Sequence, residues 1–195
     1  MMTANWIEKH SGQTVVVKFG GNAMVDAELM RSFCDDIVEL MRAGIRVVVT
    51  HGGGPQISSE LAARGLESEF RGGLRVTSLA AVDAVRDVLV RIGGELVESL
   101  ELAGVTAVAF AGHELGLFAA RKVGTVVDGE MIELGQVGEA VSVETSMITA
   151  TLDAGGVPVI SAIGRDLSDG ELLNINADAA ASSLAVALAA QWLVL

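Results

Sequence analysis

Four short segments of the 195-residue sequence carry the glycines and polar side chains that could do chemistry. The first is KFGGN at positions 18–22, where a β-branched run ends in a lysine and two glycines. Glycines let a backbone pass close to a ligand, so Gly20 and Gly21 could cradle phosphate oxygens beside the charge of Lys18. The same turn is also typical of plain structure in which the lysine reaches solvent. It matches neither the P-loop nor the GxGxxG fingerprint of dinucleotide folds.

The second segment is HGGGPQ at positions 51–56, between an apolar run and a helical pattern that begins at Pro55. Three glycines cost backbone entropy and a plain turn needs at most one, so the segment favours a ligand site. Amides exposed at a helix N-terminus bind anions. His51 has no second ligand at metal spacing, so we interpret it as a structural hydrogen-bonding residue.

The third segment, GGLRVT at positions 72–77, is interpreted as a loop that carries Arg75 into a helix starting at Ser78. An arginine fork matches a carboxylate with two hydrogen bonds, which predicts an anionic ligand. Pairing of Arg75 with Glu67 or Glu69 at the surface would explain the arginine equally well.

The fourth segment, NINAD at positions 174–178, alternates polar residues with apolar ones in apolar surroundings. Buried polar groups need partners, so the segment is a candidate site. Asp178 could instead cap the final helix.

Hydrophobic patterns predict the elements that position these segments. The β-branched runs at 14–18 and 46–50 are each followed by glycines and a helical pattern, and further strands are predicted at 105–110, 157–162 and 192–195. Continuous apolar strands that alternate with helices indicate a parallel sheet covered on both faces. We therefore predict an α/β fold, a three-layer αβα sandwich around an open, mostly parallel sheet.

Helices are predicted at 26–43, where Gly44 supplies a C-terminal cap, from Ser78 onward, and at 145–154. The pair Gly93–Gly94 interrupts the second of these, which predicts a kink or the close approach of another backbone. Alternation around Asp128–Gly129 predicts a β-hairpin excursion at a sheet edge.

Composition excludes several classes of partner. The sequence has 13 basic and 25 acidic residues, a net charge of -12, which repels nucleic acid and anionic membranes. An anionic substrate stays open, because one cation at contact range outweighs a diffuse field. Cys34 is the single cysteine, so we expect no disulfide and no cysteine metal site, and we predict no metal-binding residues. The N-terminal residues do not fit a signal peptide, and we expect a cytoplasmic protein.

The four segments together resemble acetylglutamate kinases, members of the amino-acid kinase family, through the strings VVVKFGGNAM, VVVTHGGGPQI, FRGGLRVTS and LLNINADAAA. The resemblance runs nearly end to end and agrees with the predicted fold. It implies ATP-dependent phosphorylation, with Mg²⁺ accompanying ATP, of the side-chain carboxylate of N-acetyl-L-glutamate. The product would be an acyl phosphate for arginine biosynthesis.

The resemblance also implies roles for the residues on the phosphoryl side of the site. Lys18 would be catalytic and stabilise the phosphoryl group in flight, while Gly20 and Gly21 would approach its oxygens. Asp178 would be catalytic by orienting lysines.

Substrate-binding roles follow from the same resemblance. Gly53 and Gly54 would hold oxygens through their amides, Arg75 would clamp a carboxylate, and Asn174 would hydrogen-bond the same acid. A carboxylate acceptor is ionised at neutral pH, so such a site needs alignment and charge neutralisation rather than a strong base.

Against the family pattern, residues 1–195 are expected to form a single domain, the N-terminal substrate half, without the half that binds ATP. The isolated chain is therefore expected to be inactive. Gly112–Gly116 (GHELG) departs from the usual sequence there. The resemblance implies a homodimer through the helix from Ser78, and Trp6–Lys9 faintly resembles the helix that joins dimers into hexamers. Two alternatives stay open: a non-catalytic acetylglutamate-binding module, and a relative acting on another acid such as acetylaminoadipate.

Overall fold

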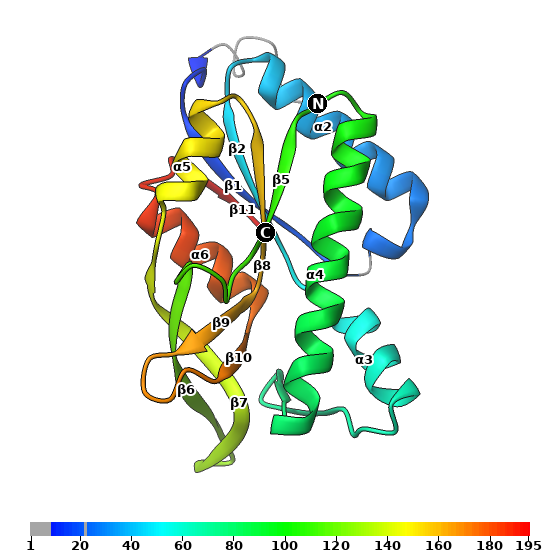
Figure 1. Cartoon of the computed structure of the whole chain (residues 1–195), viewed down its shortest axis with the longest axis vertical. Coiled ribbons are helices and arrows are strands. Elements are labelled where there is room, and N and C mark those ends of the chain that lie inside the picture. The colour runs from blue at the N-terminus through cyan, green and yellow to red at the C-terminus, as the bar shows by residue number, and fades with distance from the viewer. Residues whose placement is uncertain (1–8, 22) are drawn as a thin grey trace.

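The computed structural model describes residues 9–21 and 23–195, so most of the Trp6–Lys9 prediction lies outside it. Its centre is a five-stranded sheet, all parallel, in the order β11-β1-β2-β8-β5 (Figure 1). The strands are β1 (Thr14–Phe19), β2 (Arg46–His51), β5 (Ala107–Ala111), β8 (Val157–Ser161) and β11 (Trp192–Val194). The predicted parallel sheet is confirmed.

Helices cover both faces of this sheet, which confirms the three-layer prediction. Along β1 and β2, Val15 and Val47 pack in one hydrophobic core with α2 and α4, whereas Val16 and Val48 pack in a second core with α5 and α6. This alternation follows from the period of two along a strand. The helical elements are η1 (Ala23–Val25), α2 (Ala27–Arg42), α3 (Gly54–Ala63), α4 (Leu79–Leu102), α5 (Ser146–Asp153) and α6 (Ala177–Ala187).

A second, smaller sheet lies below the central one in Figure 1 and closes on itself in the order β10-β7-β6-β9. Its strands are β6 (Phe118–Val127), β7 (Glu130–Val143), β9 (Ile163–Asp166) and β10 (Leu172–Ile175). The hairpin turn at Asp128–Gly129 is confirmed, with φ of 51° and 85°. Its predicted position at a sheet edge is wrong, because β9 and β10 pair with the hairpin and give it a sheet of its own.

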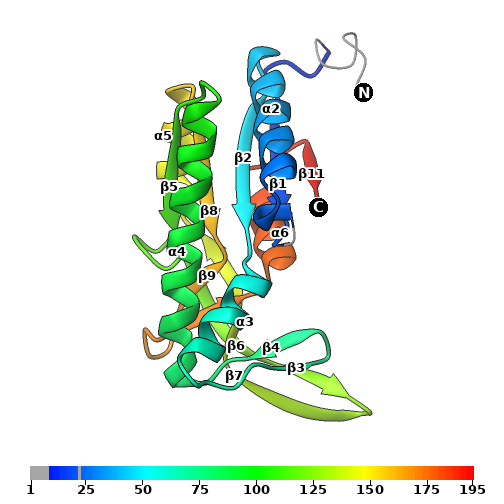
Figure 2. The same cartoon turned by 90° about the vertical axis from the view of Figure 1, so that its right-hand side faces the viewer.

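The segment before α4 also differs from its prediction. Residues 72–77 are not a plain loop: β3 (Glu69–Arg71) and β4 (Leu74–Val76) form a hairpin whose turn is Gly72–Gly73, both with positive φ. Figure 2 shows this hairpin and α3 at the lower end of the molecule, near the β6–β7 ribbon. Helix α4 then begins at its predicted cap, Ser78, whose side chain accepts a hydrogen bond from the amide of Ala81.

Helix α4 continues through Gly93 and Gly94. A Cβ at Gly93 would lie 3.3 Å from Nε2 of His51 and 3.8 Å from Cβ of Ala109, so the close neighbours are side chains of β2 and β5 rather than a backbone. Gly94 has open space beside it, and nothing in the structure explains that glycine. No helix of the described residues is long and apolar enough to cross a lipid bilayer.

The core beneath α4 gives a first prediction. Leu96 is 0% exposed and Leu102, on the same helix, is 91% exposed. Leu96→Ala leaves a cavity and should lower the free energy of unfolding by about 2 to 5 kcal/mol. Leu102→Ala should change it by less than about 0.5 kcal/mol. Chemical denaturation of both variants measures the difference, and equal losses would contradict the packing described here.

Candidate functional site

The loops after β1 and β2 leave the carboxyl ends of two parallel strands of the central sheet, where ligands bind in open parallel sheets. The segment after β10 of the closed sheet meets them there. A Cβ at Gly21 would lie 2.8 Å from Cδ of Pro55 and 3.3 Å from the amide nitrogen of Gly54. A Cβ at Gly52 would lie 3.2 Å from Cβ of Ala177. The first, second and fourth predicted segments are therefore neighbours. Gly21 and Gly52 can lie this close to Pro55 and Ala177 because glycine has no side chain.

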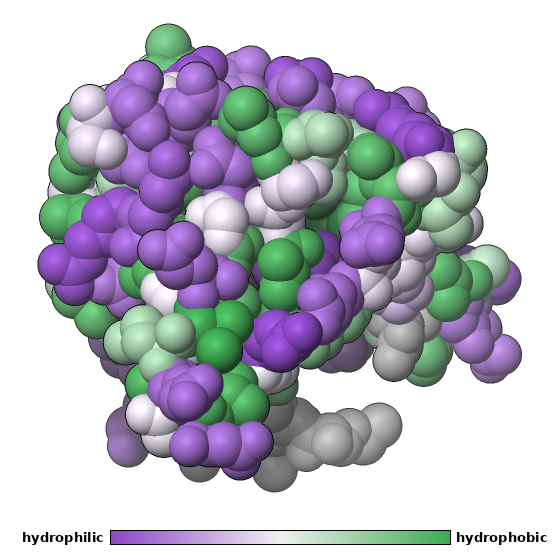
Figure 3. Space-filling model, turned by 90° about the horizontal axis from the view of Figure 1, so that it is seen from below, coloured by the Kyte–Doolittle hydropathy of each residue, from purple (hydrophilic) through white to green (hydrophobic). Residues whose placement is uncertain are grey.

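A cavity of about 180 Å³ opens where the second, third and fourth segments meet. Four predicted substrate-binding residues line it: Gly53, Gly54, Arg75 and Asn174. Seen from below, the surface of the molecule carries intermixed polar and apolar side chains (Figure 3). The other four predicted residues, Lys18, Gly20, Gly21 and Asp178, do not line this cavity, and neither does the departing segment Gly112–Gly116.

Arg75 is held inside this cavity by neutral groups. Its Nη2 donates to the carbonyl oxygen of Gly54 at 2.8 Å and to Oγ of Ser58 at 3.0 Å, and its Nη1 donates to Oγ of Ser68. The guanidinium carbon lies 4.5 Å from the ring centroid of Phe70, a cation–π contact. The side chain is therefore fixed in direction from α3, the β3–β4 hairpin and the loop between them.

The charge of Arg75 has no counter-ion in the described part of the chain. The predicted alternative, pairing with Glu67 or Glu69, is wrong, because Glu69 pairs with Arg71 at 2.5 Å. Arg75 is only 6% exposed, and burial lowers the pKa of its guanidinium, which still stays protonated at neutral pH. A buried cation bonded only to neutral oxygens favours an anionic ligand, because such a ligand supplies the missing charge.

Lys18 and Asp178 form the second charged part of the site. Nζ of Lys18 lies 3.0 Å from Oδ1 of Asp178, and their side chains are 23% and 55% exposed. The capping alternative for Asp178 is wrong: Asn176 caps α6, and its Oδ1 accepts from the amides of Asp178 and Ala179. A pair this exposed adds little stability, so its main effect is to hold the lysine beside the glycine loop.

His51 stands behind the triple-glycine loop. It is 0% exposed, and its Nδ1 lies 3.0 Å from the carbonyl oxygen of Gly52, so Nδ1 carries the proton and donates. Its Nε2 has no hydrogen-bond partner among the described residues. Burial lowers the pKa of the ring to about 4, so the ring is neutral at pH 7. The predicted structural hydrogen-bonding role is confirmed.

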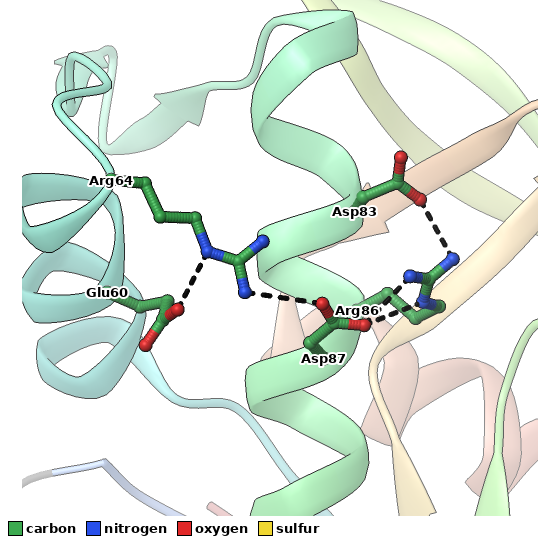
Figure 4. Close-up of polar contacts among 5 residues, drawn as sticks. All are labelled: Glu60, Arg64, Asp83, Arg86 and Asp87. Carbon is green, nitrogen blue, oxygen red and sulfur yellow. Dashed lines mark hydrogen bonds and ion pairs between the residues drawn. The ribbon is translucent and has the colours of Figure 1, made fainter.

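Helix α3, whose first turn presents Gly54 to the cavity, is tied to α4 by exposed charges (Figure 4). Nε of Arg64 donates to Glu60 at 2.7 Å, and its Nη2 lies 3.3 Å from Asp87 of α4. Arg86 closes the chain of charges by pairing with Asp87 and Asp83, each at 2.8 Å. Of these pairs, only the contact between Arg64 and Asp87 joins the two helices, and an exposed pair of this kind contributes little stability.

Sequence reasoning did not find several groups that build the site. Ser58, Ser68 and Phe70 hold Arg75, and Thr77 accepts from Nδ2 of Asn174 at 3.2 Å. A single serine in a helix and another in a loop carry no local signal for such a role. Thr77 stands two residues after Arg75 in the third segment, and only the strand pairing shows what it contacts. Within residues 9–21 and 23–195, no group of three or more His, Cys, Asp or Glu side chains is placed to hold a metal ion.

Fold and site together define an α/β domain with a small cavity near the carboxyl ends of a parallel sheet, which a buried arginine enters. The model of the amino acid kinase family matches residues 13–195, and the chain belongs to that family. It is 49% identical to the acetylglutamate kinase of Paenarthrobacter aurescens (strain TC1) over 97% of this chain and 63% of that protein. Identity to the acetylglutamate kinase of Streptomyces avermitilis is 48%, over 97% of this chain and 62% of that one.

Among solved structures, an N-acetylglutamate synthase from Neisseria gonorrhoeae, in complex with coenzyme A and N-acetyl-glutamate, superposes with a TM-score of 0.81. Its sequence is 26% identical, over 97% of this chain and 42% of that chain. The chain thus spans a little under two thirds of the length of the acetylglutamate kinases that it matches.

The buried ring of His51 gives a prediction for pH. Its pKa is about 4 when folded and near 6.5 when unfolded, so the unfolded state binds the proton first as pH falls. Stability should therefore be full above pH 6.5 and decline by about 3 kcal/mol as pH approaches 4. Denaturant unfolding at several pH values measures this decline.

A His51→Gln variant is the control, because glutamine does not titrate. Burial also lowers the pKa of His113, so the variant should lessen the slope between pH 6.5 and 4 rather than abolish it. An unchanged slope would show that His51 is protonated as easily in the folded state as in the unfolded one.

Proposed function

We propose that this chain is the substrate-binding part of an acetylglutamate kinase and binds N-acetyl-L-glutamate in the cavity that Arg75 enters. The observation that carries the proposal is the buried guanidinium of Arg75, whose hydrogen-bond partners in the described residues are all neutral. Two kinds of likeness support the acid named here. The matched kinases act on acetylglutamate by name, and the Neisseria gonorrhoeae synthase holds N-acetyl-glutamate on a similar fold.

The two carboxylates of the acid would have different places. Arg75 and Asn174 would receive the α-carboxylate inside the cavity, with the amides at the start of α3 near the acid. The side-chain carboxylate would point toward Lys18, which stands outside the cavity lining beside the first glycine loop. In this arrangement the residues that would recognise the acid are different from the lysine that would neutralise the charge developing on the phosphoryl group.

The reaction needs no proton transfer. The ionised side-chain carboxylate attacks the γ-phosphorus of ATP, a new oxygen–phosphorus bond forms, and the bond to the β–γ bridging oxygen breaks, which releases ADP. Lys18 would neutralise charge on the phosphoryl group in transit, and Gly20 and Gly21 would let their amides approach its oxygens. Asp178, 3.0 Å from Lys18, would hold that lysine in direction.

ATP and Mg²⁺ belong to the proposal as co-substrate and its bound ion. Because the described side chains form no metal cluster, Mg²⁺ would arrive on the phosphates of ATP. The matched kinases are longer than this chain. We propose that the main ATP contacts come from a region like the part of those kinases that this chain does not cover. A cytoplasmic location and a homodimer, with dimers joined into a hexamer, complete the proposal.

Calorimetry with each ligand alone tests the proposed binding. The chain should bind N-acetyl-L-glutamate and bind ATP far more weakly, since the cavity is lined by the residues assigned to the acid. N-acetyl-L-aminoadipate, one methylene longer, is the competing acid. Tighter binding of this longer acid would move the assignment to the relative that acts on it, and no binding of either would overturn the proposal.

Substitution of Arg75 tests the contact itself. Arg75→Ala removes a charged hydrogen bond to the acid, so the affinity for N-acetyl-L-glutamate should fall by about 1.5 to 3 kcal/mol. Arg71→Ala is the matched control, because Arg71 lies on the same hairpin but is exposed and paired with Glu69. Calorimetric titration of both variants distinguishes the site from a general effect of hairpin charge. An unchanged affinity in Arg75→Ala would exclude Arg75 from the site.

A further inference from the structure

Thr77 joins the two side chains that the proposed function assigns to the α-carboxylate. It is 0% exposed and lies between β4, which carries Arg75, and the start of α4. We propose that Thr77 is a positioning residue, which fixes Arg75 and Asn174 relative to each other and so sets the recognition of this carboxylate. The inference rests on the proposed function and deepens it.

The backbone of Thr77 attaches the Arg75 strand to the small closed sheet. Its amide donates to the carbonyl oxygen of Leu134 at 2.9 Å, and its own carbonyl accepts from the amide of Gln136 at 2.7 Å. Between these two residues stands Gly135, with φ of 71°. A Cβ at Gly135 would lie 2.5 Å from the carbonyl oxygen of Thr77, so this approach requires glycine.

Asn174 is mounted on the same strand, next to the contact with Thr77. It lies on β10, where it pairs in register with Val137 of β7, two residues beyond Gly135. Strand β7 therefore carries both the segment with Arg75 and the segment with Asn174. The two ligand-binding side chains, 99 positions apart in the sequence, share one rigid support.

The hydroxyl of Thr77 connects the two segments directly. Its O–H donates to the carbonyl oxygen of Arg75 at 3.2 Å, and its oxygen accepts from Nδ2 of Asn174 at 3.2 Å. An asparagine amide has two N–H donors, so one stays available to a ligand while the other is held by Thr77. Because the amide can no longer rotate freely, the second donor keeps its direction toward a carboxylate that Arg75 also contacts.

A purely structural role for a buried threonine is the competing explanation, and the chain contains a matched example. Thr50 is also 0% exposed, and its hydroxyl donates to the carbonyl oxygen of Ile160 at 2.9 Å within the central sheet. Neither Arg75 nor Asn174 is its partner. Removing either hydroxyl should lower stability, but only the hydroxyl of Thr77 should affect recognition of the acid.

The test compares T77V, T77S and T50V by calorimetry against two ligands: N-acetyl-L-glutamate and 4-acetamidobutyrate, which lacks the α-carboxylate. T77V should bind N-acetyl-L-glutamate about tenfold more weakly, the loss expected for one hydrogen bond of about 1.4 kcal/mol. It should bind 4-acetamidobutyrate as the unaltered chain does. T77S keeps the hydroxyl and should restore most of the affinity, and T50V should lower the thermal midpoint without changing either affinity.

The outcomes separate this inference from the proposed function. If the unaltered chain binds N-acetyl-L-glutamate and T77V binds it equally well, or weakens both ligands alike, the positioning role is overturned. If the unaltered chain does not bind the acid, the proposed function fails and this inference fails with it.

Should T77V not fold, the unaltered chain provides a second measurement. Under the proposal the side-chain amide protons of Asn174 exchange with water more slowly than those of Asn176, whose residue is exposed. Nuclear magnetic resonance of the two amide groups measures the rates, and equal rates would overturn the hydrogen bond on which the inference depends.

Discussion

The site depends on how closely the loops after β1 and β2 of the central sheet approach each other and the segment after β10 of the closed sheet. The absence of a side chain at three glycines permits this approach. A Cβ at Gly21 would meet Pro55, a Cβ at Gly52 would meet Ala177, and a Cβ at Gly53 would lie 2.6 Å from Cδ1 of Ile92. Parallel strands bring their ends to one edge of the sheet by topology alone. Glycine then lets the chains that leave these ends approach each other closely.

The charge inside the cavity is opposite in sign to the net charge of the protein. The chain carries a net charge of -12, yet Arg75 is buried with neutral partners, while the exposed Arg64, Arg71 and Arg86 are paired with carboxylates. An arginine already paired offers little to a ligand. An unpaired cation in a partly dry cavity attracts an anion strongly at contact range, whereas the diffuse field of the surface is screened by salt. Composition therefore argues against nucleic acid as a partner but could not decide for or against a small acid.

Local signals predicted most of the central sheet and its helices, because apolar runs, cap residues and glycines act over a few positions. Partners distant in sequence were the difficulty. From the sequence, Glu69 was as plausible a partner for Arg75 as any ligand, but in the structure Glu69 pairs with Arg71 of the same strand, β3. Asp178 and Asn176 are both good capping residues, and only the three-dimensional position of Lys18 explains why Asn176 caps the helix while Asp178 turns to the lysine. The closed sheet likewise depends on β9 and β10, which are distant in sequence from the β6–β7 hairpin with which they pair.

The two sheets divide the work of the site between them. Under the proposed function, the central sheet supplies Lys18 and the first glycine loop for the phosphoryl group, whereas Arg75 and Asn174 are attached to β7 of the closed sheet through Thr77 and the β10 pairing. Under the proposed function, recognition of the α-carboxylate and stabilisation of the phosphoryl group would draw mainly on different sheets. The two parts are nevertheless coupled, because Arg75 donates to the carbonyl oxygen of Gly54 in the second glycine loop, and Asp178, which pairs with Lys18, stands three residues after the end of β10.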